Sequence, residues 1–164
     1  MFRRSRPPSE PQSHELTLFA DYFQVHVSDD GSDGDLSDAW TEEASGRGLA
    51  VAQGIVGVST ARNVDVPVTV TITPEPPDAP ADADSIVEAD LECKSGRFVV
   101  MGCTDYYSEA TRMTVPPGWY RVRASALRLS TVREQWLDAE DEYRIDLWPT
   151  PPTGIVVVKP HRWA

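Results

Sequence analysis

The stretch VDVPVTVTI, Val64 to Ile72, decides the fold class of this chain. Its apolar side chains fall on strict alternation at Val64, Val66, Val68, Val70 and Ile72. Residues two apart in an extended chain share one face, so these five side chains form a single apolar surface. The stretch therefore predicts a β-strand with one face buried against a core.

Shorter strand-like segments lie on both sides of this stretch. The segment ELTLFADYFQVHVSD changes phase near Asp21, which predicts one long strand with a bend or bulge. The segments at 87–93 and 97–105 flank Lys94-Ser95-Gly96 and predict a hairpin. Three more segments with strand signals follow, at 119–128, 143–147 and 154–160. Short helices are predicted only at 37–46, with Ser37 or Thr41 as the N-cap, and at 131–138.

About eight or nine short strands separated by turn signals are typical of one architecture. The prediction is an all-β fold, either an antiparallel two-sheet sandwich or a jelly-roll-like barrel, with one or two short helices. The chain length of 164 residues suits one domain. We expect a flexible tail over residues 1–13 and a single β-sandwich domain over residues 14–160.

The charge balance restricts the kind of partner. The chain has 15 basic and 26 acidic residues, for a net charge of -11. Nucleic acids and anionic lipids are polyanions, so this balance opposes binding to either and favours a basic partner. An acidic balance also keeps many proteins soluble, and that reading stays open.

Location and thiol chemistry follow from two further features. No apolar run approaches the roughly 20 residues that a spanning helix needs, and the N-terminus lacks the apolar part of a signal peptide. We therefore expect a cytoplasmic protein without membrane contact. In the predicted hairpin, Cys93 and Cys103 lie too far apart or on opposite faces for a disulfide, so both are expected to be reduced.

The most unusual segment is DDGSDGDLSDAWTEE, residues 29–43, with seven carboxylates and no Lys or Arg. It imitates the start of a calcium loop, but position twelve, where an EF-hand needs a bidentate Glu, is Trp40. Calcium binding, a partner contact surface and a solvated loop remain as alternatives. The predicted partner-binding residues are Asp29, Asp30, Asp33, Asp35, Asp38, Trp40, Glu42 and Glu43.

Signals for catalysis, metals and cofactors are weak. The three histidines are scattered, and His26 alternates opposite Val25 and Val27, which predicts that it faces solvent. We expect no metal, no cofactor and no enzymatic activity. An alternative ligand site, suited to a sugar or other small molecule, is predicted at Asp105, Tyr106, Tyr107 and Trp119.

A basic stripe is predicted on the strand that begins at Trp119. There Trp119, Arg121 and Arg123 alternate with apolar residues and should face outward. Such a stripe could bind an anion or single-stranded nucleic acid. Salt bridges to a neighbouring strand explain it more simply.

The order of several segments resembles a known family. These segments are ELTLFADYFQV, WTEEASGRGLAVAQGIVGV, the valine strand and PPGWYRVR. They resemble the small bacterial proteins grouped with competence protein J, in which an acidic W-T-(D/E)-E turn precedes a strand containing Gly and Ala. The chain departs from that pattern at GSDGDLSD and at the proline-rich loop 74–80. Members of the family are linked with inhibition of a competence nuclease, so the resemblance implies a non-enzymatic, partner-binding role.

Two hypotheses for function follow. The first is a cytoplasmic protein-binding module, such as an acidic inhibitor of a basic nuclease or toxin, whose carboxylates imitate phosphates. The second is a sandwich that binds a small molecule or sugar, with or without weak hydrolase activity. The oligomeric state does not follow from the sequence.

Overall fold

The structure is a computed structural model that describes residues 10–134 and 136–163. The first nine residues of the predicted flexible tail lie outside the described residues. The first strand begins at Gln12, two residues before the predicted domain start.

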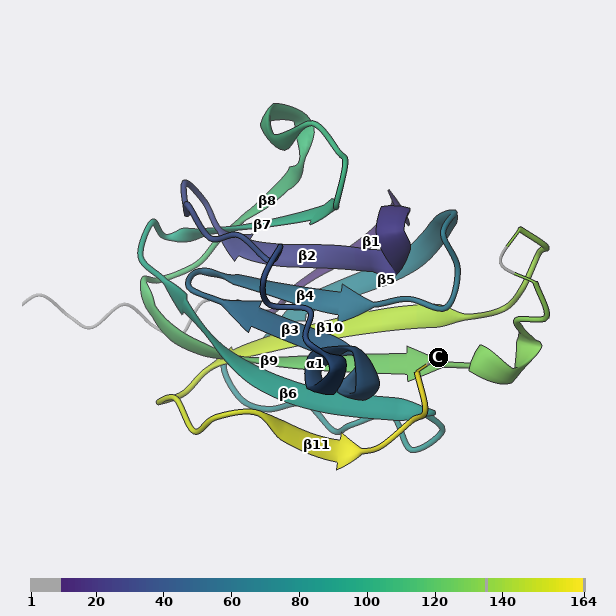
Figure 1. Ribbon diagram of the computed structural model, residues 1–164. Coiled ribbons are helices and arrows are strands. Elements are labelled where there is room, and N and C mark those ends of the chain that lie inside the picture. The colour runs from purple at the N-terminus through teal and green to yellow at the C-terminus, as the bar shows by residue number, and fades with distance from the viewer. Residues whose placement is uncertain (1–9, 135, 164) are drawn as a thin grey trace, which may run out of the picture.

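Two sheets stack face to face and enclose the core, which confirms the predicted two-sheet sandwich (Figure 1). In the described part of the chain neither sheet closes into a barrel. The six-stranded sheet runs in the order β1 (Gln12–Phe19), β5 (Asp65–Ile72), β10 (Glu142–Pro149), β9 (Gly118–Leu127), β6 (Ser85–Cys93), β11 (Val156–Lys159). The five-stranded sheet runs in the order β3 (Leu49–Ala52), β4 (Ile55–Ser59), β2 (Gln24–Asp29), β7 (Arg97–Gly102), β8 (Thr111–Thr114).

The valine stretch forms β5 and buries the predicted face. The side chains of Val66, Val68, Val70 and Ile72 are at most 3% exposed, while Asp65 and Pro67 face out. β5 pairs antiparallel with β1 but parallel with β10, so this pair departs from the antiparallel arrangement of the predicted sandwich. The chain passes through four other strands between β5 and β10, and local turn signals cannot reveal a pair of that kind.

The phase change near Asp21 marks a passage between sheets, so the prediction of one long or bent strand was wrong. β1 ends at Phe19, a 3-10 turn (η1, Asp21–Phe23) follows, and β2 continues in the other sheet. Tyr22 and Phe23 have φ of 57° and 58°, the left-handed region that non-glycine residues rarely adopt. Each such residue costs roughly 1 to 3 kcal/mol.

The predicted hairpin around Lys94-Ser95-Gly96 was also wrong. β6 and β7 belong to different sheets, and the turn carries the chain from one sheet to the other. The two strands contribute buried side chains to the same core from opposite sheets, and the buried residues of β7 run consecutively from Phe98 to Val100 instead of alternating. Cys93 is buried and Cys103 is half-buried, and both are free thiols as predicted.

One of the two predicted helices forms. α1 spans Glu42–Arg47, and its N-cap is Thr41, whose Oγ1 accepts a hydrogen bond from Ala44 N at 3.1 Å. Gly48 ends the helix at φ +81°, a left-handed C-cap. The second prediction, at 131–138, was wrong: the described residues there form no α-helix, and a 3-10 turn (η3, Leu129–Thr131) precedes an irregular loop. A third 3-10 turn (η2) spans Tyr107–Glu109.

The predicted basic stripe on β9 lies on the outer face of the six-stranded sheet, but it is covered. Arg121 and Arg123 are only 4% and 8% exposed. Both pair with Glu88 on β6, at 3.1 Å and 2.9 Å, and Arg121 also pairs with Asp90 at 2.8 Å. The carbonyl of Pro77, in the proline-rich loop, accepts a hydrogen bond from Arg123. The salt-bridge explanation of the stripe is therefore confirmed.

Candidate partner-binding site

The first residue of the acidic segment holds the fold together. Asp29 is 6% exposed, at the end of β2. Its carboxylate accepts hydrogen bonds from the backbone N–H groups of Lys94 and Ser95, both at 3.0 Å, and from the Ser95 hydroxyl at 2.6 Å. Burial acts to raise the pKa of Asp29, but these hydrogen bonds outweigh it and hold the pKa below its ordinary value. Asp29 therefore fixes the turn between the sheets.

Replacing Asp29 with asparagine is expected to lower the free energy of unfolding by about 2 kcal/mol, because a neutral amide cannot accept three such bonds with charge assistance. The measurement is urea unfolding at pH 7, with Asp33→Asn as the matched control. Asp33 is exposed, so the control should stay within about 0.5 kcal/mol of the unchanged protein. Equal stability of the two variants would contradict the structural role of Asp29.

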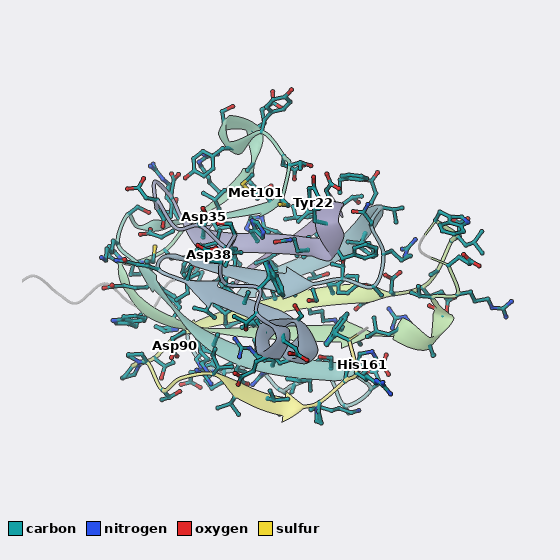
Figure 2. The ribbon with its side chains drawn as sticks, in the orientation of Figure 1. Tyr22, Asp35, Asp38, Asp90, Met101 and His161 are labelled. Atoms are coloured by element: carbon teal, nitrogen blue, oxygen red, sulfur yellow. The ribbon has the colours of Figure 1, made fainter. Side chains whose placement is uncertain are left out.

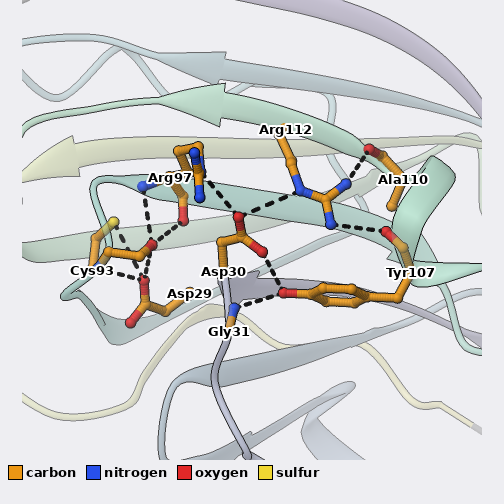
Figure 3. A network of polar contacts seen from close by, with 9 residues as sticks. Asp29, Asp30, Gly31, Cys93, Arg97, Tyr107, Ala110 and Arg112 are labelled. Carbon is orange, nitrogen blue, oxygen red and sulfur yellow. Dashed lines mark hydrogen bonds and ion pairs between the residues drawn. The ribbon is translucent and has the colours of Figure 1, made fainter.

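The next carboxylate, Asp30, is also engaged within the chain (Figure 3). It accepts a hydrogen bond from the Tyr107 hydroxyl at 2.5 Å and pairs with Arg97 at 2.9 Å and Arg112 at 3.4 Å. The Tyr107 hydrogen bond, followed by the charge of Arg112 and the contacts of Arg97, lowers the pKa of Asp30. Since its charge is neutralised locally, Asp30 joins Asp29 as a structural residue.

The remaining carboxylates of the segment are exposed. Asp33, Asp35 and Asp38 lie on the loop between β2 and α1, and Glu42 and Glu43 occupy the first turn of α1. Asp35 and Asp38 are labelled in Figure 2, where both project from the loop that leads from β2 to α1. Among the described residues only Glu43 of this group has a cation partner, Arg47 at 3.9 Å. We call these five carboxylates, Asp33, Asp35, Asp38, Glu42 and Glu43, the acidic face. They are the part of the predicted site that is accessible to a partner.

Trp40 anchors the acidic face to the sandwich. Its indole lies against Gly57 of β4, where an added Cβ would come within 2.9 Å of the ring. Its Nε1 donates a hydrogen bond to Gln24 Oε1 at 3.0 Å. With Leu36 and Ala44 it forms a small apolar cluster under the loop. The carboxylates therefore project from a fixed backbone, which reduces the entropy lost on binding.

A groove of about 1130 Å³ runs beside the acidic face, between the two sheets. One wall contains Asp33 and Asp35, and the other contains Glu92 and Trp119. Among the described residues a single cation, Lys94, lines it, and Lys94 lies 3.9 Å from Glu92. The groove is therefore acidic with an aromatic wall, since Trp119 is 41% exposed.

The alternative ligand residues do not form one site. Trp119 lines the groove, whereas Asp105, Tyr106 and Tyr107 are absent from its lining. Asp105 accepts a hydrogen bond from Gly102 N at 2.7 Å within its own turn, and Tyr106 is 79% exposed. Tyr107 supports Asp30. The four residues predicted together are therefore divided among a groove, a turn and a structural network.

A smaller cleft at the start of β2 was missed from the sequence. It has a volume of about 390 Å³, and four aromatic residues line it: Tyr22, Phe23, Trp40 and Trp163. A signal was present in the adjacent aromatic residues Tyr22 and Phe23 at the phase change. In a continuous strand these two side chains would lie on opposite faces, so they could not line one cleft. Trp163 lies about 140 residues further along the chain, and no local pattern connects it with the others.

The described residues contain no group of three or more His, Cys, Asp and Glu side chains placed to hold a metal ion. Among their helices, none is long and apolar enough to cross a membrane. His26, predicted to face solvent, is half-buried, and its Nε2 lies 2.6 Å from Gln24 Oε1. The prediction that His26 faces solvent was wrong because the side chain is half-buried, and this burial lowers the pKa of His26 to about 4.

The fold and the charged surface together define an acidic protein of two stacked β-sheets with an exposed carboxylate face. The model of the family described as Competence protein J (ComJ) matches residues 17–148, most of the chain. The chain therefore belongs to the ComJ family.

Two solved structures are similar in fold. One is described as ComJ from Bacillus subtilis, inhibitor of the DNA degrading activity of NucA. It has a TM-score of 0.70 and 17% identity, and the match covers 87% of this chain and 100% of that one. The other is described as "Crocagin biosynthetic gene J", with a TM-score of 0.60, 20% identity and the same coverage. No curated protein sequence matches this chain.

Proposed function

We propose that this protein is a non-enzymatic binding domain that inhibits a basic nuclease. The observation that carries the proposal is the acidic face, whose carboxylates are exposed and largely without cation partners in the described chain. The nucleic-acid site of a nuclease must attract phosphates, so it is basic. An ordered row of carboxylates can occupy such a site in place of DNA.

The family supports this proposal in its general form. The Bacillus subtilis relative is described as an inhibitor of a nuclease, although at 17% identity its likeness extends to the fold alone. The acidic face supports the proposal independently of the family, because Asp33, Asp35 and Asp38 lie in the segment that departs from the family pattern. The net charge of -11 adds long-range attraction to a basic partner.

The test reverses the charge of Asp33, Asp35, Glu42 and Glu43 to lysine. We expect the affinity for a basic nuclease of the host to fall at least tenfold, with a flatter salt dependence. The partner is first captured from host lysate at low salt and identified by mass. Affinity is then measured by calorimetry at two salt concentrations, and inhibition by the rate of DNA degradation.

The matched control reverses four exposed carboxylates elsewhere, Glu75, Asp78, Asp82 and Glu140. It changes the net charge by the same amount but leaves the acidic face intact, so its affinity should fall much less. An equal loss in both variants would mean that total charge, not this face, attracts the partner. Unchanged affinity in the first variant would exclude the acidic face from the contact.

The groove supports a second candidate, binding of a small polar molecule or sugar. An exposed indole at Trp119 beside carboxylates suits the apolar face and the hydroxyls of a sugar ring. A rise in melting temperature with a panel of sugars, lost in Trp119→Ala, would favour this candidate over nuclease inhibition. If no sugar raises the melting temperature, the sugar-binding candidate is wrong.

A further inference from the structure

The aromatic cleft lies at the opposite end of β2 from the acidic groove. Besides its four aromatic side chains, its lining residues carry hydroxyl or amide groups. The nearby basic residues Arg47 and Arg162 do not line it, and Arg47 Nε donates a hydrogen bond to the carbonyl of Leu49. The cleft is therefore aromatic, uncharged and open to solvent.

Both indoles of the cleft are fixed by the fold. Trp40 is held through its hydrogen bond to Gln24 Oε1. Trp163 packs on Gly48, where an added Cβ would come within 2.3 Å of the indole nitrogen, so only glycine leaves room. Trp163 also meets His161 edge to face, with ring centroids 5.1 Å apart. The aromatic walls are thus arranged before any ligand arrives.

The other two aromatic residues gain little from the fold. Tyr22 is 69% exposed and Phe23 is 42% exposed, although both occupy the strained left-handed region. Because the two rings bury little surface within the chain, their packing does not offset the free-energy cost of this backbone conformation. Asp21 secures the turn, because its carboxylate accepts hydrogen bonds from Tyr22 N and from the Thr104 hydroxyl, both at 3.0 Å. Strain held in place beside an exposed cleft is typical of a binding site. In Figure 2 Tyr22 lies in the upper part of the view and Asp90 of the groove at the lower left.

The electrostatics of the cleft favour a cation. The faces of aromatic rings carry negative charge density, and a guanidinium or ammonium group within about 6 Å of a ring centre is attracted to it. Two exposed carboxylates, Glu42 and Glu43, begin α1 directly after Trp40 and Thr41. A cation entering the cleft would therefore meet aromatic rings, and the carboxylates of Glu42 and Glu43 follow Trp40 by only two and three residues in the chain.

We propose that the aromatic cleft of Tyr22, Phe23, Trp40 and Trp163 holds an arginine or lysine side chain of the protein partner. The inference rests on the proposed function, since that function makes the partner a basic protein. It adds a pocket that selects one projecting side chain, whereas the acidic face attracts the basic surface as a whole. Trp163 lies beyond the residues that the family model matches, so the complete cleft need not occur in other family members.

The first test uses N-acetylarginine amide as a probe and its neutral isostere N-acetylcitrulline amide as the control. The chain has five tryptophans, so its indole N–H signals can be followed by NMR. We expect the signals of Trp40 and Trp163 to shift with the arginine probe, at least fivefold more tightly than with citrulline. Trp136 and Trp148 lie outside the cleft and serve as internal references. Equal binding of the two probes, or no shift at these two residues, would overturn the proposal.

The second test is Tyr22→Gly, which removes the ring and relieves the positive φ. Relief of strain offsets the extra freedom of glycine in the unfolded chain, so we expect the melting temperature to stay close to that of the unchanged protein. Affinity for the arginine probe and for the nuclease partner should fall at least fivefold. Tyr106→Gly, which removes an exposed ring outside the cleft, is the matched control and should bind as before.

The two proposals fail in different ways. If the charge-reversed acidic face loses the nuclease but Tyr22→Gly binds it fully, the cleft proposal is wrong and nuclease binding stands. If the protein inhibits no nuclease, the proposed function is wrong. In that case a selective shift of the Trp40 and Trp163 signals with the arginine probe still supports the cleft as a site for a basic side chain, and the absence of such a shift overturns it.

Discussion

Replacing Arg62 with alanine is expected to lower the free energy of unfolding by about 3 to 5 kcal/mol, because it leaves a buried carboxylate without its cation. Arg62 and Asp141 are 7% and 1% exposed. Arg62 Nη2 lies 2.6 Å from Asp141 Oδ1, and Nε donates to the same oxygen at 2.8 Å. The pair joins the loop before β5 to the start of β10, the two parallel strands.

The other oxygen of Asp141 makes the pair part of a network. It accepts a hydrogen bond from the Tyr143 hydroxyl at 2.6 Å, and that hydroxyl accepts one from Ala61 N at 2.8 Å. Burial, together with the contact to Asp141, raises the pKa of Tyr143 above its ordinary value. Loss of Arg62 would therefore disturb a chain of buried polar groups.

Urea unfolding at pH 7 measures this effect. Arg133→Ala, which removes an exposed arginine, is the control and should change stability by no more than about 0.5 kcal/mol. The double variant Arg62→Met, Asp141→Leu should recover much of the loss, since no unpaired charge remains buried. A loss below about 1 kcal/mol for Arg62→Ala would contradict the importance of the pair.

Acidification from pH 7 to pH 4 is expected to cost up to about 3 kcal/mol of stability through His26 alone. Burial lowers the pKa of His26 from 6.5 to about 4 in the folded protein. Between pH 6.5 and pH 4, His26 is therefore mostly protonated in the unfolded chain but mostly neutral in the folded protein. The stabilising effect of neutral His26 is complete above that pH and is lost as the pH falls to about 4.

The measurement is urea unfolding between pH 8 and pH 4 for the unchanged protein and for His26→Gln. Stability of the variant should fall much less between pH 6.5 and pH 4, and the two profiles should run parallel above pH 7. Asp29 and Asp30, whose pKa values are lowered from 3.8, contribute stability that is lost only as the pH falls below that value. Identical slopes between pH 6.5 and pH 4 would show that His26 is not the cause.

Several features of this protein follow from the sequence because they depend on local chemistry. Alternation along β5 fixes one buried face, whatever the rest of the chain does. The cap of α1 is readable because the Thr41 hydroxyl reaches a backbone N–H three residues away. The family resemblance, seen in four segments, is confirmed over residues 17–148.

The candidate site is predictable only in part. The sequence marks the whole acidic segment, but it cannot distinguish Asp29 and Asp30 from the carboxylates that follow them. The difference arises from Ser95, Arg97 and Tyr107, which lie more than 60 residues away in the chain. A carboxylate is structural or free according to the donors that the fold brings to it.

The class of fold, the acidic character and the helix that bears Glu42 and Glu43 can thus be predicted from the amino-acid order, since period, composition and capping act over a few residues. Three further features depend on the folded arrangement: which strands pair in parallel, where the chain passes from one sheet to the other, and which carboxylates stay exposed. The cleft that Tyr22, Phe23, Trp40 and Trp163 share depends on it as well. These outcomes depend on contacts between distant segments, and the free energy of such contacts exists only once both segments are in place.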